Sequence, residues 1–172
     1  MVSRLILMAS ATALLAGCAS PPGGPRASAQ LLPTTGSSTS GSASFVQAGG
    51  KVRVSGEVRG LKPNAEHGFH VHEKGDCSSG DGMSAGGHFN PTGAPHGKHD
   101  AGMHHTGDLP SLKADASGVA RFSFESSTIS IGSGVTDIVG KGLIVHRDPD
   151  DYKTQPTGNA GPRLACAVIA RN

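Results

Sequence analysis

The sequence has no strong excess of charge of either sign and, after its first 17 residues, no long hydrophobic run. Fifteen lysine and arginine residues against 13 aspartate and glutamate residues leave a formal net charge of +2. This balance argues against a nucleic-acid partner, which a strongly basic domain would indicate. The lack of a second apolar segment excludes a membrane-spanning helix in the body of the chain. No window of helical length has a regular apolar period with caps, so we expect an all-β protein.

The first 17 residues are typical of a secretory signal peptide. Arg4 precedes an apolar run that ends in Leu-Ala-Gly-Cys, and the run is too short to span a membrane. This ending resembles a bacterial lipobox, in which Cys18 becomes the lipidated first residue of the mature chain. The alternative is an ordinary signal peptide cleaved nearby, with Cys18 incidental. Removal of residues 1–17 takes away one positive charge, that of Arg4, and changes the net charge from +2 to +1.

Residues 18–42 are rich in proline, glycine and serine and poor in large apolar residues. Such a composition cannot bury enough surface to fold, so it predicts a flexible tether. Residues 43–172 have the size of one domain with its own core. We expect this domain in the bacterial periplasm, attached to a membrane only through the lipid anchor. Ala19 and Ser20 fit sorting to the outer membrane.

Three cysteines are an odd number for an exported protein. Lipidation of Cys18 would leave Cys77 and Cys166 to form one disulfide in an oxidising compartment. Their bridge would close a loop of about 90 residues and contribute at most ~4–5 kcal/mol through chain entropy. The alternative is that both remain unpaired, buried thiols.

Short strands separated by glycine and proline predict an antiparallel sandwich or barrel. Residues 42–58 predict two strands joined at Gly49-Gly50, because glycine allows the positive φ of a two-residue hairpin turn. Further strands are predicted at residues 67–72, 118–126, 141–146 and 163–170. In contrast, residues 73–115 contain almost no β-forming residues, and so long a loop in a compact domain is usually functional.

Eight of the nine histidines fall between His67 and His105. On a strand, His70 and His72 would leave from the same face, about 6.5–7 Å apart at Cα, so both rings could reach one metal ion. By itself, such a pair is more often incidental than a ligand pair. The long loop adds further candidate ligands: His88, His96, His105 and Asp108. Neutral imidazoles with one carboxylate suit Zn²⁺ or Cu²⁺, and the alternative is a solvated loop with unspecific metal affinity.

A resemblance to the bacterial, exported copper/zinc superoxide dismutases rests on five segments: GFHVHEKGDC, SAGGHFNP, HHTGDLP, LIVHRDPDD and GNAGPRLACAVI. They occur in the right order and at consistent spacing. The resemblance implies a Greek-key antiparallel β-sandwich, or flattened barrel, of about eight strands with long metal-binding and electrostatic loops. It also implies one copper and one zinc ion per subunit. The implied reaction is dismutation of superoxide to O₂ and H₂O₂, which would protect the cell envelope.

The resemblance assigns metal ligands to the matching positions. The copper ligands would be His70, His72, His88 and His146. The zinc ligands would be His88, His96, His105 and Asp108, so that His88 bridges the two ions. The choice of His146 rests on the family alone, because a lone histidine at a strand end is usually incidental.

The resemblance also implies roles for residues around the metals. Arg163 would stand beside the open copper position and attract the superoxide anion, and His88 would take part in catalysis as the bridge. Asp150 would hydrogen-bond one copper-binding and one zinc-binding histidine, here His70 and His96. The disulfide between Cys77 and Cys166 would pin the metal-binding loop to the last strand.

Some residues match no family role. Three histidines are interpreted as surface or auxiliary residues: His67, His99 and His104. Pro156 stands where eukaryotic members have a lysine, so three other lysines remain candidates for steering the substrate: Lys74, Lys98 and Lys153. A monomer and a homodimer both remain open. Two other functions also remain open, a periplasmic lipoprotein that stores or delivers copper or zinc and a non-catalytic β-sandwich attachment module.

Overall fold

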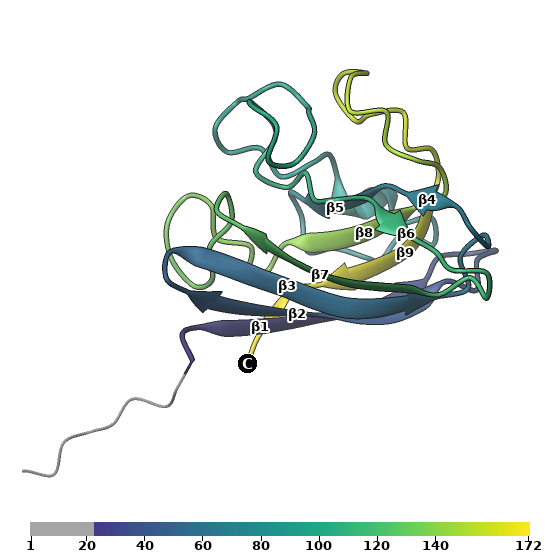
Figure 1. The fold of residues 1–172 in the computed structure, drawn as a ribbon, viewed down its shortest axis with the longest axis horizontal. Coiled ribbons are helices and arrows are strands. Elements are labelled where there is room, and N and C mark those ends of the chain that lie inside the picture. The colour runs from purple at the N-terminus through teal and green to yellow at the C-terminus, as the bar shows by residue number, and fades with distance from the viewer. Residues whose placement is uncertain (1–22) are drawn as a thin grey trace, which may run out of the picture.

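The computed structural model describes residues 23–172, which form ten strands and one short 3₁₀ turn (Figure 1). The strands are β1 (Arg26–Pro33), β2 (Ser40–Ala48), β3 (Lys51–Arg59), β4 (Glu66–His67), β5 (Phe69–His72), β6 (Leu112–Lys113), β7 (Ala120–Ser126), β8 (Gly142–His146), β9 (Arg163–Val168) and β10 (Ala170–Arg171), and the turn is η1 (Met83–Ala85). All pairings between these strands are antiparallel, which confirms the predicted fold class. Nothing helical within residues 23–172 has the length and hydropathy needed to cross a bilayer.

One sheet of eight strands follows the order β5-β8-β9-β1-β2-β3-β7, with β10 paired to β1 beside this path. β4 and β6 form a separate two-stranded sheet. The large sheet curves into a half-barrel (Figure 1). β9 pairs with β1 in the middle of this sheet, so the first strand and one of the last strands of the described chain lie side by side.

The predicted hairpin at Gly49-Gly50 is confirmed. β2 and β3 pair along their whole length on either side of the turn. Gly49 and Gly50 have φ angles of 58° and 80°, which favour residues without a Cβ atom. Val52, Val54 and Val58 are all buried, as their shared parity predicts.

The prediction that residues 18–42 form a tether is wrong from Arg26 onward. β1 occupies Arg26–Pro33, pairs with both β2 and β9, and buries Ala27 and Leu31. Its buried residues alternate with polar ones, which is the pattern of a half-buried strand. The composition concealed this alternation because the buried positions are mostly alanine. The folded domain begins at β1, and the signal peptide and Cys18 lie outside the described residues.

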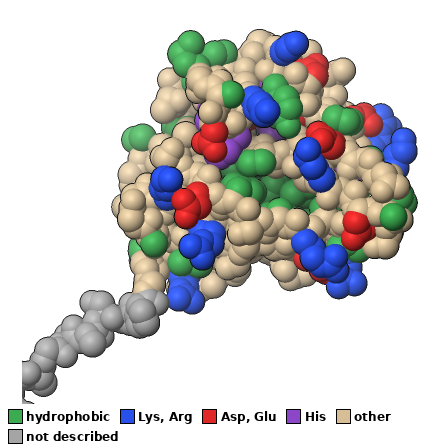
Figure 2. All heavy atoms as spheres, in the orientation of Figure 1, with side chains coloured by type: hydrophobic (Ala, Val, Ile, Leu, Met, Phe, Trp, Pro, Cys, Tyr) green, Lys and Arg blue, Asp and Glu red, His purple; other side chains and the backbone are tan. Residues whose placement is uncertain are grey.

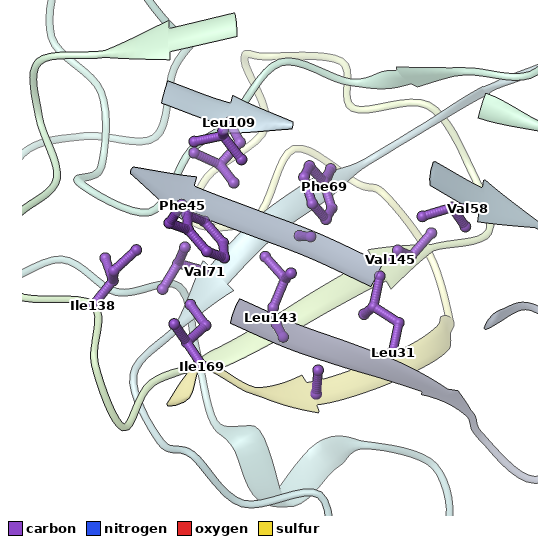
Figure 3. Packing of buried hydrophobic residues seen from close by; sticks show 14 of the residues in the cluster. Leu31, Phe45, Val58, Phe69, Val71, Leu109, Ile138, Leu143, Val145 and Ile169 are labelled. Atoms are coloured by element: carbon purple, nitrogen blue, oxygen red, sulfur yellow. The ribbon is translucent and has the colours of Figure 1, made fainter. Parts of the chain in front are cut away.

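The curved sheet encloses one hydrophobic core (Figure 3). The largest fully buried side chains include Leu31, Phe45, Phe69, Leu143 and Ile169. Burial of each such side chain stabilises the fold by about 1.5–3 kcal/mol. These residues come from β1, β2, β5, β8 and the segment after β9, so the core joins strands that are far apart in sequence.

β5 and β8 are buried on both of their faces. Phe69 and Val71 of β5 pack into the core, so His70 and His72 leave the opposite face of the strand. The long loops that follow β5 and β8 lie over that face (Figure 1). The fold therefore encloses two histidines between the sheet and its loops.

Cys77 and Cys166 form the predicted disulfide. The two residues are 89 positions apart, and their bond links the loop after β5 to β9. Cys166 also packs with Ala85 and Ile144 in a small apolar cluster. The bond thus fastens one covering loop to the sheet.

Leu31 and Leu32 offer a matched test of β1. Leu31 is fully buried, whereas Leu32 is 62% exposed. We expect Leu31→Ala to lower the free energy of unfolding by about 2–5 kcal/mol. Leu32→Ala should lower it by less than about 0.5 kcal/mol. Urea denaturation of both variants measures the difference, and equally small effects would show that this segment does not belong to the folded sheet.

Candidate metal centre

The long loop after β5 returns to that strand and docks along its edge. Backbone hydrogen bonds tie Val71 of β5 to the loop on both its N–H and its carbonyl. Isolated β-bridges join His70 to Asp108 and His72 to His88. The edge of β5 therefore sets two loop residues beside the two histidines that the strand carries.

Four buried histidines form what we call the first donor set: His70, His72, His88 and His146. One ring nitrogen from each lies within 4.8 Å of those of the others. His72 Nε2 and His146 Nε2 are 3.4 Å apart. This approach is possible because β5 and β8 are neighbours in the sheet.

The second donor set also has four buried residues: His88, His96, His105 and Asp108. His88 Nδ1 lies 2.9 Å from Asp108 Oδ1 and 3.4 Å from His105 Nδ1. His96 Nδ1 lies 3.0 Å from Asp108 Oδ2. His88 belongs to both sets, and because its Nδ1 faces the second set, its Nε2 is left for the first.

Unsatisfied ring nitrogens and the spacing of the ligand atoms indicate that the donor sets fit a metal ion. Two buried ring nitrogens of the first set, His70 Nδ1 and His88 Nε2, have no hydrogen-bond partner among residues 23–172, and each such atom costs about 1–3 kcal/mol when left unsatisfied. In the second set, His96 Nδ1 faces the carboxylate of Asp108 instead. Ligand atoms about 2.0–2.1 Å from a tetrahedral ion lie roughly 3.4 Å apart. The nitrogen–nitrogen distances of 3.4 Å in both sets match that separation.

Asp150 orients one ring in each donor set. His70 Nε2 donates to Asp150 Oδ2 (2.7 Å), and His96 Nε2 donates to Asp150 Oδ1 (2.9 Å). An ionised carboxylate can only accept, so the Nε2 atom of each ring carries a proton and Nδ1 is turned toward its donor set. Gly158 leaves room for this contact, because a Cβ atom there would lie 1.9 Å from Asp150 Oδ1.

Backbone carbonyls orient two more rings. His72 Nδ1 donates to Gly86 O (2.9 Å), and His146 Nδ1 donates to Gly161 O (3.1 Å). The Nε2 atom of each ring is thereby left as a lone-pair donor toward the first set.

Burial keeps three rings of the first donor set neutral. It lowers the pKa of His72 and of His146 well below 6.5, and neighbouring histidines add to the effect. Burial also lowers the pKa of His88 to about 4. Neutral imidazole is the form that binds a metal ion.

The second donor set is more polar. Burial lowers the pKa of His96, but hydrogen bonds to Asp108 and Asp150 outweigh it and raise that pKa to about 9. Burial raises the pKa of both carboxyl groups, but hydrogen bonds with histidines hold each pKa well below 3.8. Without metal, the ring of His96 is therefore a cation between two carboxylates. Its Nδ1 must lose a proton before it can bind an ion.

Arg163, at the start of β9, lies half-buried beside the first donor set. Its guanidinium donates to Gly82 O (2.6 Å) and to Gly86 O (2.5 Å). Because Gly86 O also accepts from His72, one carbonyl holds the guanidinium and a ring of the first set together. The structure thus fixes a positive charge next to the histidines.

Little of the histidine surface reaches solvent. His70 and His72 have no exposed area, and in Figure 2 the visible imidazole surface lies in a recess. The seven predicted metal ligands, with Asp150 and Arg163, are brought together in this one buried cluster, and the predicted disulfide links the loop after β5 to β9. Cys18 lies outside the described residues.

His67 and His99, which we interpreted as surface or auxiliary residues, are buried, with His67 only 1% and His99 only 6% exposed. Burial excludes the surface alternative for both and leaves the auxiliary one, whereas His104 is half-buried. His67 Nδ1 donates to His146 O (2.9 Å), across 79 positions of sequence, so no local pattern could have revealed the contact. The three candidate steering lysines are all exposed: Lys74, Lys98 and Lys153.

Comparisons with known proteins agree on one family. The family model described as copper/zinc superoxide dismutase (SODC) matches residues 39–169. The Cu-Zn superoxide dismutase of Paramecium bursaria Chlorella virus 1 is 45% identical over 135 residues, which cover 75% of this chain and 71% of the viral protein. Cu-Zn superoxide dismutase 2 of Aquifex aeolicus (strain VF5) is 38% identical over 148 residues, or 84% of this chain and 86% of the relative. The crystal structure of the clock protein EA4 is 41% identical with a TM-score of 0.76, covering 84% of this chain and 93% of that one.

The raised pKa of His96 predicts a pH-dependent stability of the metal-free protein. A group with a raised folded-state pKa stabilises the fold fully below its unfolded value of 6.5, and the contribution is lost as the pH rises through about 9. We expect the free energy of unfolding to fall between neutral pH and about pH 9. Urea titrations with a chelator present measure it. His96→Gln should remove most of the decline, and an equal decline in both proteins would contradict the prediction.

Proposed function

This chain belongs to the copper/zinc superoxide dismutase family, and we propose that it removes superoxide in the bacterial cell envelope with copper in the first donor set and zinc in the second. The reaction converts two superoxide anions and two protons into O₂ and H₂O₂. The observation that carries the assignment is the ring of His88, which belongs to both donor sets. A shared ring allows one metal to fix the residue that serves the other.

The chemistry of the two donor sets supports this assignment. Four neutral imidazoles suit copper, whereas three imidazoles with one carboxylate are a typical set for zinc. Copper, when bound, can take an electron from one superoxide and give it to the next, which zinc cannot do. The carboxylate of Asp108 and the three rings around it would hold the second ion in a closed structural site.

His88 would also supply a proton to the product. Its Nδ1 is held in the second donor set, 2.9 Å from Asp108 Oδ1, so the ring stays in place while Nε2 gains or loses a proton. Nε2 has no hydrogen-bond partner within residues 23–172 and belongs to the first donor set, so a proton taken up there can be passed to a peroxide anion in that set.

Arg163 would draw the substrate to the first donor set. Its guanidinium is held by two carbonyls and carries a positive charge, which attracts a small anion and can hydrogen-bond it. A metal store or an attachment module would leave this charge without a role. The position of Arg163 therefore favours the enzyme over both alternatives.

Arg163→Ala tests the proposed function. The wild-type protein should hold one copper and one zinc ion per chain and consume superoxide. We expect the variant to keep both metals, to lower the second-order rate on the order of tenfold at low ionic strength, and to weaken the dependence of that rate on salt. Pulse radiolysis and elemental analysis provide the two measurements.

Arg53→Ala is the matched control for Arg163→Ala. Arg53 is exposed on β3, so its loss removes the same charge without touching the donor sets. The control should retain the wild-type rate. A wild-type rate in Arg163→Ala at low salt would remove Arg163 from the mechanism, and a metal-loaded wild-type protein that leaves superoxide untouched would overturn the function itself.

We place the enzyme in the periplasm, attached through a lipid on Cys18, on the evidence of the sequence. The signal peptide and the Leu-Ala-Gly-Cys ending support this location, and Ala19 and Ser20 favour the outer membrane. Because β1 begins at Arg26, the connection from Cys18 is short and reaches about 26–29 Å at most when extended. The domain would therefore work close to the membrane surface.

Cys18→Ser tests the anchor. The variant should appear in the soluble periplasmic fraction with unchanged superoxide consumption, whereas the wild-type protein should sediment with membranes. Cell fractionation followed by an activity assay measures both. Membrane retention of the variant would exclude lipidation of Cys18 as the attachment.

A further inference from the structure

His99 is a buried histidine that belongs to neither donor set. It lies in the segment between His96 and His105, both members of the second set. Of residues 98–103, only His99 is buried. A single buried side chain in an otherwise exposed segment indicates that this side chain attaches the segment to the rest of the domain.

The ring of His99 contacts Asp108 on one side and strand β7 on the other. His99 Nδ1 donates to the backbone carbonyl of Asp108 (3.0 Å). On the other side of the ring, Nε2 lies 3.3 Å from the carbonyl oxygen of Glu125 and 3.3 Å from Asp100 Oδ2. The ring also packs edge-on against Phe124, with 5.8 Å between centroids. Since Phe124 and Glu125 belong to β7, the ring of His99 stands between Asp108 and the barrel.

The segment needs such a fastening because it has little other structure. It contains no strand, and Gly102 has a φ of 86°, which marks a turn. Asp108 organises its two ends: its Oδ2 accepts the backbone N–H groups of Gly97 (3.1 Å) and His105 (2.9 Å). The position of the Asp108 backbone therefore decides where the ligand atoms at both ends of the segment lie.

We infer that His99 is a positioning residue for the second donor set: it holds the backbone of Asp108, and with it the segment from His96 to His105, against β7. The inference rests on the proposed assignment of zinc to that set. Loss of the Nδ1 donor frees the Asp108 carbonyl, so more conformational freedom must be given up when zinc binds. Supporting contacts of this kind typically change metal affinity 10–100-fold.

Three substitutions of His99 separate its contacts. His99→Phe keeps a ring against Phe124 but has no donor. His99→Asn places an amide N–H at the position of Nδ1 and should restore the bond to Asp108. His99→Gln places the amide farther out, near the position of Nε2, and should not. Lys98→Ala is the matched control, because Lys98 is the exposed neighbour in the same segment.

The measurements are zinc affinity, by competition with a chelator on the metal-free chain, and the visible spectrum of Co²⁺ bound in place of zinc. We expect His99→Phe and His99→Gln to bind zinc about 10–100-fold more weakly, with an altered Co²⁺ spectrum. His99→Asn should recover most of the affinity and the wild-type spectrum, and Lys98→Ala should match the wild-type protein. Copper affinity should stay unchanged throughout.

Two results would overturn the inference. One is wild-type zinc affinity and Co²⁺ spectrum in His99→Phe. The other is equal behaviour of His99→Asn and His99→Gln, which remains decisive if His99→Phe fails to fold. Failure of the wild-type chain to bind zinc would instead contradict the metal assignment, so the two failures are distinguishable.

Discussion

Buried lone pairs and negative charges that face one another are the constraint on which this structure depends. The two donor sets place ring nitrogens 3.4 Å apart and set one carboxylate among them, away from solvent. Apolar packing cannot satisfy such groups, because each unsatisfied atom destabilises the folded state. A bound cation can satisfy them together, and the loops that supply the ligands are held only as well as that cation and the contacts around it allow.

The fold therefore has two parts that are stabilised in different ways. The barrel is held by alternating apolar residues and continuous strand pairing, which need no cofactor. The covering loops are held by the disulfide, by polar contacts of side chains with backbone, and by the edge of β5. Close approach is needed for these contacts, and glycine permits it: a Cβ atom at Gly107 would lie 2.2 Å from the carbonyl oxygen of Val71. The many glycines of the chain serve the loops more than the strands.

Local patterns in the sequence were enough to predict the elements that depend on them. The alternating valines of β3 and the glycine pair before them predicted the hairpin of β2 and β3. The spacing of His70 and His72 predicted that both rings leave the same face of a strand. The strand β1 escaped prediction because alanine at its buried positions made it look like a linker. His146 could be chosen only from the resemblance, since its approach to His72 depends on the pairing of β5 with β8. The burial of His67 and His99 could not be predicted because both rings bind backbone carbonyls, one remote in the sequence and one within the long loop.

The central place of β1 in the sheet has a practical consequence for work with this protein. A recombinant fragment that starts at Ala43 would keep every metal ligand and the disulfide, yet it would lack the strand between β2 and β9. Two inner strands would then present rows of unpaired backbone N–H and C=O groups, which readily pair with other chains. Such a fragment would be prone to aggregate even though it contained every metal ligand and both cysteines.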